Sequence, residues 1–216
     1  MNNPAFNENP ITEVIIEKKH SFFNGLRNII HQGDILTDRI WKEKGKEWKQ
    51  GNQIFEGDIS NRNYFVNEGL IKDDNYPVLY QERTAELKTL KGGEGYEATE
   101  AELSYHRELF DNCIEKEIIN WWEGGMGNLV IARYGKIDLA PEICQFARQC
   151  RNACGHLGVN ITTTKGPDPI WKGVNLKSHQ GKKLREILTE ADFIDFWIDF
   201  ERTELGVQFN TRVIRK

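Results

Sequence analysis

The chain has 216 residues, of which 38% are apolar and 29% charged, and its mean hydropathy is −0.62. A chain of this length and composition buries a sizeable core and is neither a disordered polymer nor a membrane protein. Its longest apolar runs, such as the one from Leu129 to Ala132, are far shorter than the ~20 residues of a membrane-spanning helix. The first residues lack the basic start and apolar stretch of a secretory signal, so we expect a cytoplasmic protein.

The formal net charge of −4 is unevenly distributed along the chain. Residues 124–186 contain ten basic and four acidic residues, whereas residues 1–123 contain 15 basic and 23 acidic residues. A basic segment in an acidic chain indicates either a face that binds a polyanion or an ordinary solvated surface. Charge alone does not decide between these two interpretations.

Helical periodicity dominates the beginning of the chain. Pro10 and Thr12 predict a helix start, and Gly33-Asp34 predicts its end. A second helix is predicted over residues 35–49, and the glycine- and asparagine-rich residues 50–97 predict a long irregular insertion. The apolar stripe of the first helix is Ile15, Phe22, Leu26, Ile29 and Ile30.

The clearest helix follows this insertion. Thr99 and Glu102 form a capping box at its start, and Gly124-Gly125 ends it. A shorter apolar piece over residues 126–134 comes before another break at Gly135. The apolar face of the clearest helix is Leu103, Phe110, Ile114, Ile118 and Trp121.

Two further helices are predicted in the last third of the chain. The first begins with Asp138 as its cap and ends at Gly155, and the second begins near Thr189. Residues 171–176 and the alternating tail 207–213 predict short extended pieces. Since no repeat or linker divides the chain, we predict one domain over residues 1–216. Its predicted fold is mainly all-α, a helical bundle with the long irregular insertion and with short extended pieces near the C-terminus.

Three polar side chains gather where the helix over residues 138–155 ends. Arg151 and Asn152 lie about 100° and 200° around that helix from Cys150, which belongs to its apolar stripe, and His156 follows the break. A guanidinium can hold a phosphate, an imidazole can move a proton, and an amide can orient a ligand or the imidazole. This combination suits a phosphodiester substrate.

The segment from Arg151 to His156 resembles the motif of HEPN superfamily nucleases, in which four to six residues separate Arg from His and Asn often follows the Arg. Here the spacer has four residues and Asn152 is in place. The resemblance covers residues 100–160. It implies an antiparallel HEPN-like all-α bundle that acts as a homodimeric, metal-independent endoribonuclease, with a toxin, defence or stress role.

The resemblance also implies roles for individual residues. His156 would act as general base or acid, Arg151 would stabilise the phosphorane, and Asn152 would orient the phosphate or the imidazole. RNA cleavage would leave 2′,3′-cyclic phosphate ends and would need no cofactor or metal, because the RNA 2′-hydroxyl is the nucleophile. Besides RNA and a second copy, a neutralising protein is an expected partner. The residues expected to bind RNA through its phosphates are Arg148, Lys165 and Lys172.

Other interpretations of the same residues stay open. The chain could be a non-catalytic RNA- or nucleotide-binding module, in which the basic segment and Arg151 serve binding alone. Arg and His near a helix C-terminus also complement the helix dipole without any further function. A similar segment from Arg27 to His31 has a spacer of only three residues, and we interpret it as structural.

The cysteines are predicted to be free thiols, because no secretory signal and no paired C-x-x-C motif is present. Cys150 and Cys154 fall on an apolar helix face, which favours core packing over zinc binding with His156 or a reactive thiolate. The complete set is Cys113, Cys144, Cys150 and Cys154.

Overall fold

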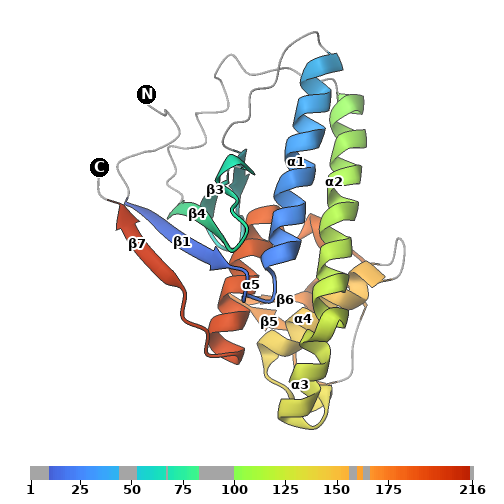
Figure 1. Ribbon diagram of the computed structural model, residues 1–216. Coiled ribbons are helices and arrows are strands. Elements are labelled where there is room, and N and C mark those ends of the chain that lie inside the picture. Colours follow the sequence, from blue (N-terminus) through green and yellow to red (C-terminus); the bar gives the residue numbers. More distant parts are fainter. Residues whose placement is uncertain are drawn as a thin grey trace.

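A five-stranded antiparallel sheet lies beside a group of helices in the computed structural model (Figure 1). The prediction of a mainly all-α bundle is therefore wrong, and the fold is mixed α/β. The structure describes residues 10–43, 53–66, 68–82, 100–155, 160–162 and 166–214.

The sheet joins the two ends of the described chain. Its strand order is β2-β3-β4-β1-β7, and the first strand pairs with both β4 and the last strand. In this register Val14 lies between Val78 and Thr211. The strands are β1 (Ile11–Glu17), β2 (Gln53–Glu56), β3 (Arg62–Val66), β4 (Asn75–Glu82) and β7 (Asn210–Ile214).

Two long helices, α1 and α2, lie side by side, and the shorter helices gather near one end of this pair (Figure 1). A two-stranded hairpin of β5 (Ile170–Trp171) and β6 (Val174–Asn175) packs against α4. A π-helical segment, Trp122–Met126, connects α2 to α3. The helices are α1 (Phe23–Glu43), α2 (Glu100–Trp121), α3 (Gly127–Tyr134), α4 (Glu142–Gly155) and α5 (Glu190–Glu204), with short 3₁₀ turns η1 (Glu68–Leu70), η4 (Ile137–Leu139), η5 (Leu176–His179) and η6 (Leu184–Glu186).

Aromatic side chains form the centre of the core. Trp121 of α2 meets Phe200 of α5 edge-on, with ring centroids 5.0 Å apart. Trp197 of α5 stacks with Phe22 at 5.6 Å, just before α1 begins. Such pairs contribute about 0.5–1.5 kcal/mol beyond the burial of their area. Helix α5 is therefore the central element that holds both long helices.

Residues 11–17 form strand β1 and not the start of a helix, which corrects the prediction based on Pro10 and Thr12. This segment is rich in β-branched residues, which favour strands, and it pairs with neighbours on both sides. Val14 and Ile16 are completely buried. Hydrogen bonding to β4 and β7 outweighs the helical spacing of Ile15 with the later apolar residues.

Gly33-Asp34 does not end the first helix, because α1 continues through both residues to Glu43. A glycine inside a helix costs about 1 kcal/mol relative to alanine. Here Gly33 and Asp34 are buried in a helix that packs along α2, so tertiary contact offsets that cost. The second helix predicted over residues 35–49 is the last part of α1, and residues 44–52 lie outside the described residues.

The predicted irregular insertion is also wrong, since β2, β3 and β4 lie within residues 50–97. In β3 the four consecutive residues 63–66 are all buried, so both faces of the strand are covered. Such a strand shows no alternation of apolar and polar residues, and periodicity cannot reveal it. Asn63 and Gln81 even place buried polar side chains in the sheet.

The elements predicted in the second half of the chain are confirmed. α2, α4 and α5 lie where the sequence predicts helices, β5 and β6 confirm extended structure near residues 171–176, and β7 confirms the alternating tail. The apolar piece over residues 126–134, for which the sequence predicts no element type, forms α3. Thr189 caps α5 through a reciprocal box with Asp192. Asp138 lies in η4 and does not cap α4, while Thr99 lies outside the described residues. No described helix has the length and apolarity that a membrane span requires.

A buried carboxylate ties the sheet and the β5–β6 hairpin to α5. Asp195, which is 0% exposed, accepts hydrogen bonds from Arg62 Nη1 and from the Tyr64 hydroxyl, both at 2.7 Å. Its other oxygen pairs with Lys172, which also lies 3.6 Å from Asp199. Burial and the Asp195 charge raise the pKa of Tyr64 well above its usual range. The tyrosine is therefore a neutral hydrogen-bond donor to the carboxylate.

We predict that Asp195→Ala lowers the free energy of unfolding by about 3–5 kcal/mol, because it leaves Arg62 and Lys172 without their buried partner. Glu82→Gln is the matched control: its carboxylate pairs with the same arginine at 2.7 Å but is 54% exposed. Such an exposed pair is worth less than about 1 kcal/mol. Urea denaturation measures the free energy of unfolding of both variants. Equal losses of stability would contradict the buried pairing of Asp195 with Arg62 and Lys172.

Candidate functional site

The apolar residues of helix α4 recur at helical spacing, so they share one buried face while polar residues lie on another. Phe146, Ala147 and Cys150 are buried, whereas Arg151 and Asn152 are half-buried. Arg148 shares their face, because residues three and four apart lie next to each other on a helix. The structure thus brings together three of the residues that the sequence singled out.

These three residues form one wall of a cavity of about 340 Å³. A side chain at residue 127 would collide with the indole of Trp122, since a Cβ there would lie 2.7 Å from Trp122 Nε1. Gly127 is therefore required for the tryptophan to take its place at the cavity. The opposite wall consists of Trp122, Glu123, Gly127, Asn128, Ile131 and Ile137.

The π-helical segment places an acidic residue against Arg151. Gly125 has a φ of 144°, which glycine adopts readily and other residues rarely adopt. This local break after α2 leaves Glu123 exposed and facing α4. Its Oε1 accepts a hydrogen bond from Arg151 Nε at 3.1 Å and another from Nη2. Arg151 Nη1 donates to Asn152 Oδ1 at 3.3 Å.

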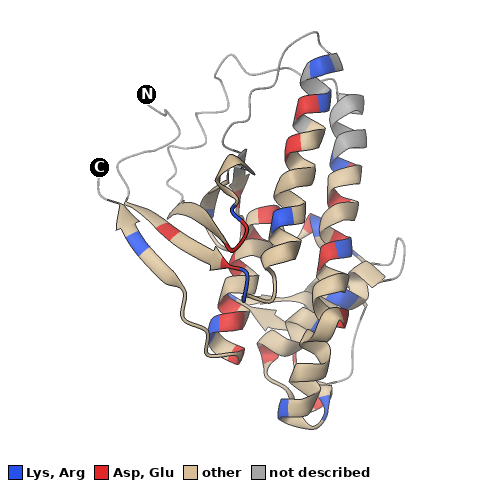
Figure 2. Cartoon of the chain, viewed as in Figure 1, with Lys and Arg blue, Asp and Glu red and all other residues tan. Residues whose placement is uncertain are grey.

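The second arginine of the cavity is also paired. Arg148 Nη1 donates to Asp138 Oδ1 at 2.6 Å. Each guanidinium therefore has a carboxylate partner among the described residues, with which any anion at the cavity would have to compete. Basic and acidic residues are also mixed along the described parts of α1 and α2 (Figure 2).

The described lining of the cavity includes three of the six predicted site residues. His156 and Lys165 fall outside the described residues. The Arg151 guanidinium packs against Gly155, the residue before His156: a Cβ there would lie 3.4 Å from Nη1. Lys172 has its ammonium group in the internal network with Asp195, so the structure uses it as a structural ion pair.

The cysteines of α4 point into the core. Cys144, Cys150 and Cys154 are buried, and burial raises the pKa of each thiol above its usual range. A neutral buried thiol is neither a nucleophile nor a metal ligand. In the described part of the chain, no group of three or more His, Cys, Asp or Glu residues is arranged to hold a metal ion.

Sequence reasoning missed the opposite wall of the cavity. Nothing in the sequence distinguishes Trp122, which lines the cavity, from its neighbour Trp121, which is a core residue with 7% exposure. No feature of the sequence marks Glu123 as a site residue, because a glutamate before two glycines is a common way for a helix to end. Only the π-helical break turns both side chains toward α4.

Comparison with protein-family models, with curated proteins and with solved structures finds no match to this chain.

We predict that Cys144, Cys150 and Cys154 react slowly with a disulfide reagent in the native protein at neutral pH, because burial keeps them neutral. Spectrophotometric thiol titration measures this. The same protein in guanidinium chloride is the control, in which all four cysteines react. Rapid labelling of Cys150 or Cys154 in the native protein would contradict their assignment to the core and would favour a reactive thiolate instead.

Proposed function

We propose that this protein binds RNA at the α4 cavity and cleaves it without a metal ion. The observation that supports the proposal is the convergence of Arg148, Arg151, Asn152 and Trp122 on one cavity. Arg151 lies beside the residue that precedes His156. Guanidinium groups recognise phosphates, and an indole provides a surface on which a base can stack.

The proposed reaction needs only the substrate and these side chains. The RNA 2′-oxygen attacks the adjacent phosphorus, the bond to the 5′-oxygen breaks, and a 2′,3′-cyclic phosphate and a 5′-hydroxyl result. His156 accepts the proton of the 2′-hydroxyl as general base and returns a proton to the leaving 5′-oxygen as general acid. Arg151 stabilises the negative charge that develops on the phosphate oxygens, and Asn152 orients its guanidinium.

This proposal rests on the side chains and not on the fold. The five-stranded sheet departs from the all-α bundle that the HEPN resemblance implies, so only the spacing of Arg151, Asn152 and His156 supports that comparison. A cytoplasmic toxin, defence or stress role with a neutralising partner belongs to the same proposal.

A binding module without catalysis is the second candidate function. The pairing of Arg151 with Glu123 and of Arg148 with Asp138 favours it, because both cations are already neutralised. The two candidates differ in one assay, incubation of labelled RNA with the protein in EDTA. A module binds RNA with an affinity that falls as salt rises, by a slope of about 0.7 per phosphate contacted, and leaves the RNA intact.

We predict that Arg151→Ala and His156→Ala each lower the rate of RNA cleavage by about 10²–10⁴-fold, because each removes a phosphate clamp or a proton-transfer group. Arg212→Ala is the matched control, since Arg212 is an exposed arginine on β7, 3.2 Å from Glu13. Gel analysis measures cleavage, and circular dichroism checks the fold. Equal activity of all three variants would refute the site.

We predict that Glu123→Gln raises the affinity for RNA by up to about fivefold, because phosphate no longer displaces a carboxylate from Arg151. Fluorescence anisotropy with a short labelled RNA at fixed salt measures the affinity. Glu142→Gln, an exposed change on α4 that does not line the cavity, is the control. A weaker complex for Glu123→Gln would mean that Glu123 positions Arg151 for binding.

We propose that two copies associate through the corner formed by α3 and η4. Leu129, Ile131 and Leu139 are 43%, 46% and 69% exposed there, and Ile131 also lines the cavity. We therefore predict that Leu139→Asp converts a dimer into a monomer that keeps its helical circular-dichroism signal. Light scattering measures the mass, and a wild-type monomer that retains cleavage would contradict the interface.

A further inference from the structure

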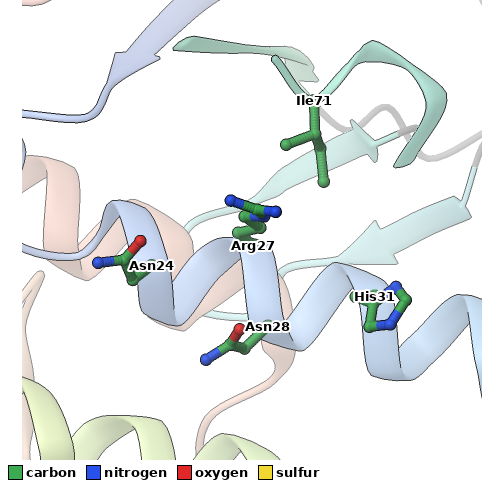
Figure 3. Close-up of a pocket in the computed structure, with 5 residues that line it drawn as sticks. All are labelled: Asn24, Arg27, Asn28, His31 and Ile71. Carbon is green, nitrogen blue, oxygen red and sulfur yellow. The ribbon is translucent and has the colours of Figure 1, made fainter. Parts of the chain in front are cut away.

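A second polar cavity, of about 460 Å³, lies on helix α1, away from the residues of the α4 site. Figure 3 shows its lining, with Arg27 extending from the helix toward Ile71, the residue after η1. His31 lies one turn further along the same helix (Figure 3). Two carboxamides, Asn24 and Asn28, complete the lining.

The four α1 residues form a polar stripe. They are spaced at positions i, i+3, i+4 and i+7, so they share one face of the helix, and all four are exposed. The neighbouring Leu26, Ile29 and Ile30 are buried and supply the packing against the rest of the protein. The Arg27–His31 segment, which we interpreted as structural, therefore contributes little to the core through its polar side chains.

Arg27 differs from the arginines of the α4 cavity in its electrostatic surroundings. Its side chain makes no hydrogen bond or ion pair with any other described residue, and no carboxylate is among the described lining residues. Glu117 of α2, a carboxylate that contacts this stripe, is 8% exposed and accepts a hydrogen bond from Asn28 Nδ2 at 3.1 Å. An anion can thus bind Arg27 without displacing a protein carboxylate.

We infer that this α1 cavity binds a small molecule that carries one phosphate group. A guanidinium binds phosphate through two parallel hydrogen bonds, and the amides and imidazole can bond the rest of the ligand. The volume falls within the range of small-molecule sites, about 300–1,000 Å³. An RNA strand would require a row of cations, whereas a single arginine is the only cation among the described residues that line this cavity, apart from the imidazole of His31.

The inference goes beyond the proposed function and is tested separately from it. Isothermal titration calorimetry with AMP and with inorganic phosphate measures binding to the wild type, Arg27→Ala and Arg151→Ala. We expect Arg27→Ala to weaken AMP binding by about tenfold or more, since it removes a charge-assisted hydrogen-bond donor. We expect Arg151→Ala to retain AMP binding. Arg39→Ala, an exposed arginine on the same helix outside the cavity, is the matched control.

Three results would overturn the inference. The first is that neither probe binds the wild type at millimolar concentration. The second is that AMP binding is unchanged in Arg27→Ala or is lost in Arg151→Ala, which would place the ligand at the α4 cavity. The third is that a short RNA displaces AMP from the Arg151→Ala variant, which would assign the α1 cavity to a phosphodiester. None of these results depends on whether the protein cleaves RNA.

Discussion

The buried carboxylate of Asp195 is the interaction on which the arrangement of this protein depends. A charge without solvent must be paired, and Asp195 is paired from two directions, by Arg62 and Tyr64 of β3 and by Lys172 of the β5–β6 hairpin. Hydrophobic contact would hold the sheet near α5 in several orientations. The directional hydrogen bonds to this one carboxylate select a single orientation.

The same helix carries a second set of restraints toward the sheet. Asp192, completely buried, accepts hydrogen bonds from the backbone of Ile59 and Ser60 at 3.0 and 2.8 Å while it caps its own helix. Helix α5 therefore fixes the β2–β3 turn and the hairpin together. The α4 cavity follows from this, because α4 packs against the hairpin and against α2, whose π-helical end supplies the other wall.

The two cavities show how neighbouring charges change what an arginine can do. Arg151 and Arg148 each already have a carboxylate partner, so a phosphate gains only the difference between two favourable contacts. Arg27 has no such partner among the described residues, and an anion there gains the full contact. Both cavities use a helix face with i, i+3 and i+4 spacing, which brings several short polar side chains within reach of one ligand.

The sequence by itself determined the helices of the second half of the chain and the polar face that bears Arg148, Arg151 and Asn152. Local signals suffice there, because a cap such as Thr189 and a 3.6-residue apolar period act within one helix. Only the tertiary structure decided the sheet and the cavity wall of Trp122 and Glu123. Strand β1 depends on partners about 65 and 200 residues away in the chain, and β3 is covered on both faces. Interactions between such distant segments leave no periodic trace in the sequence, and neither does the π-helical break that turns Glu123 toward Arg151.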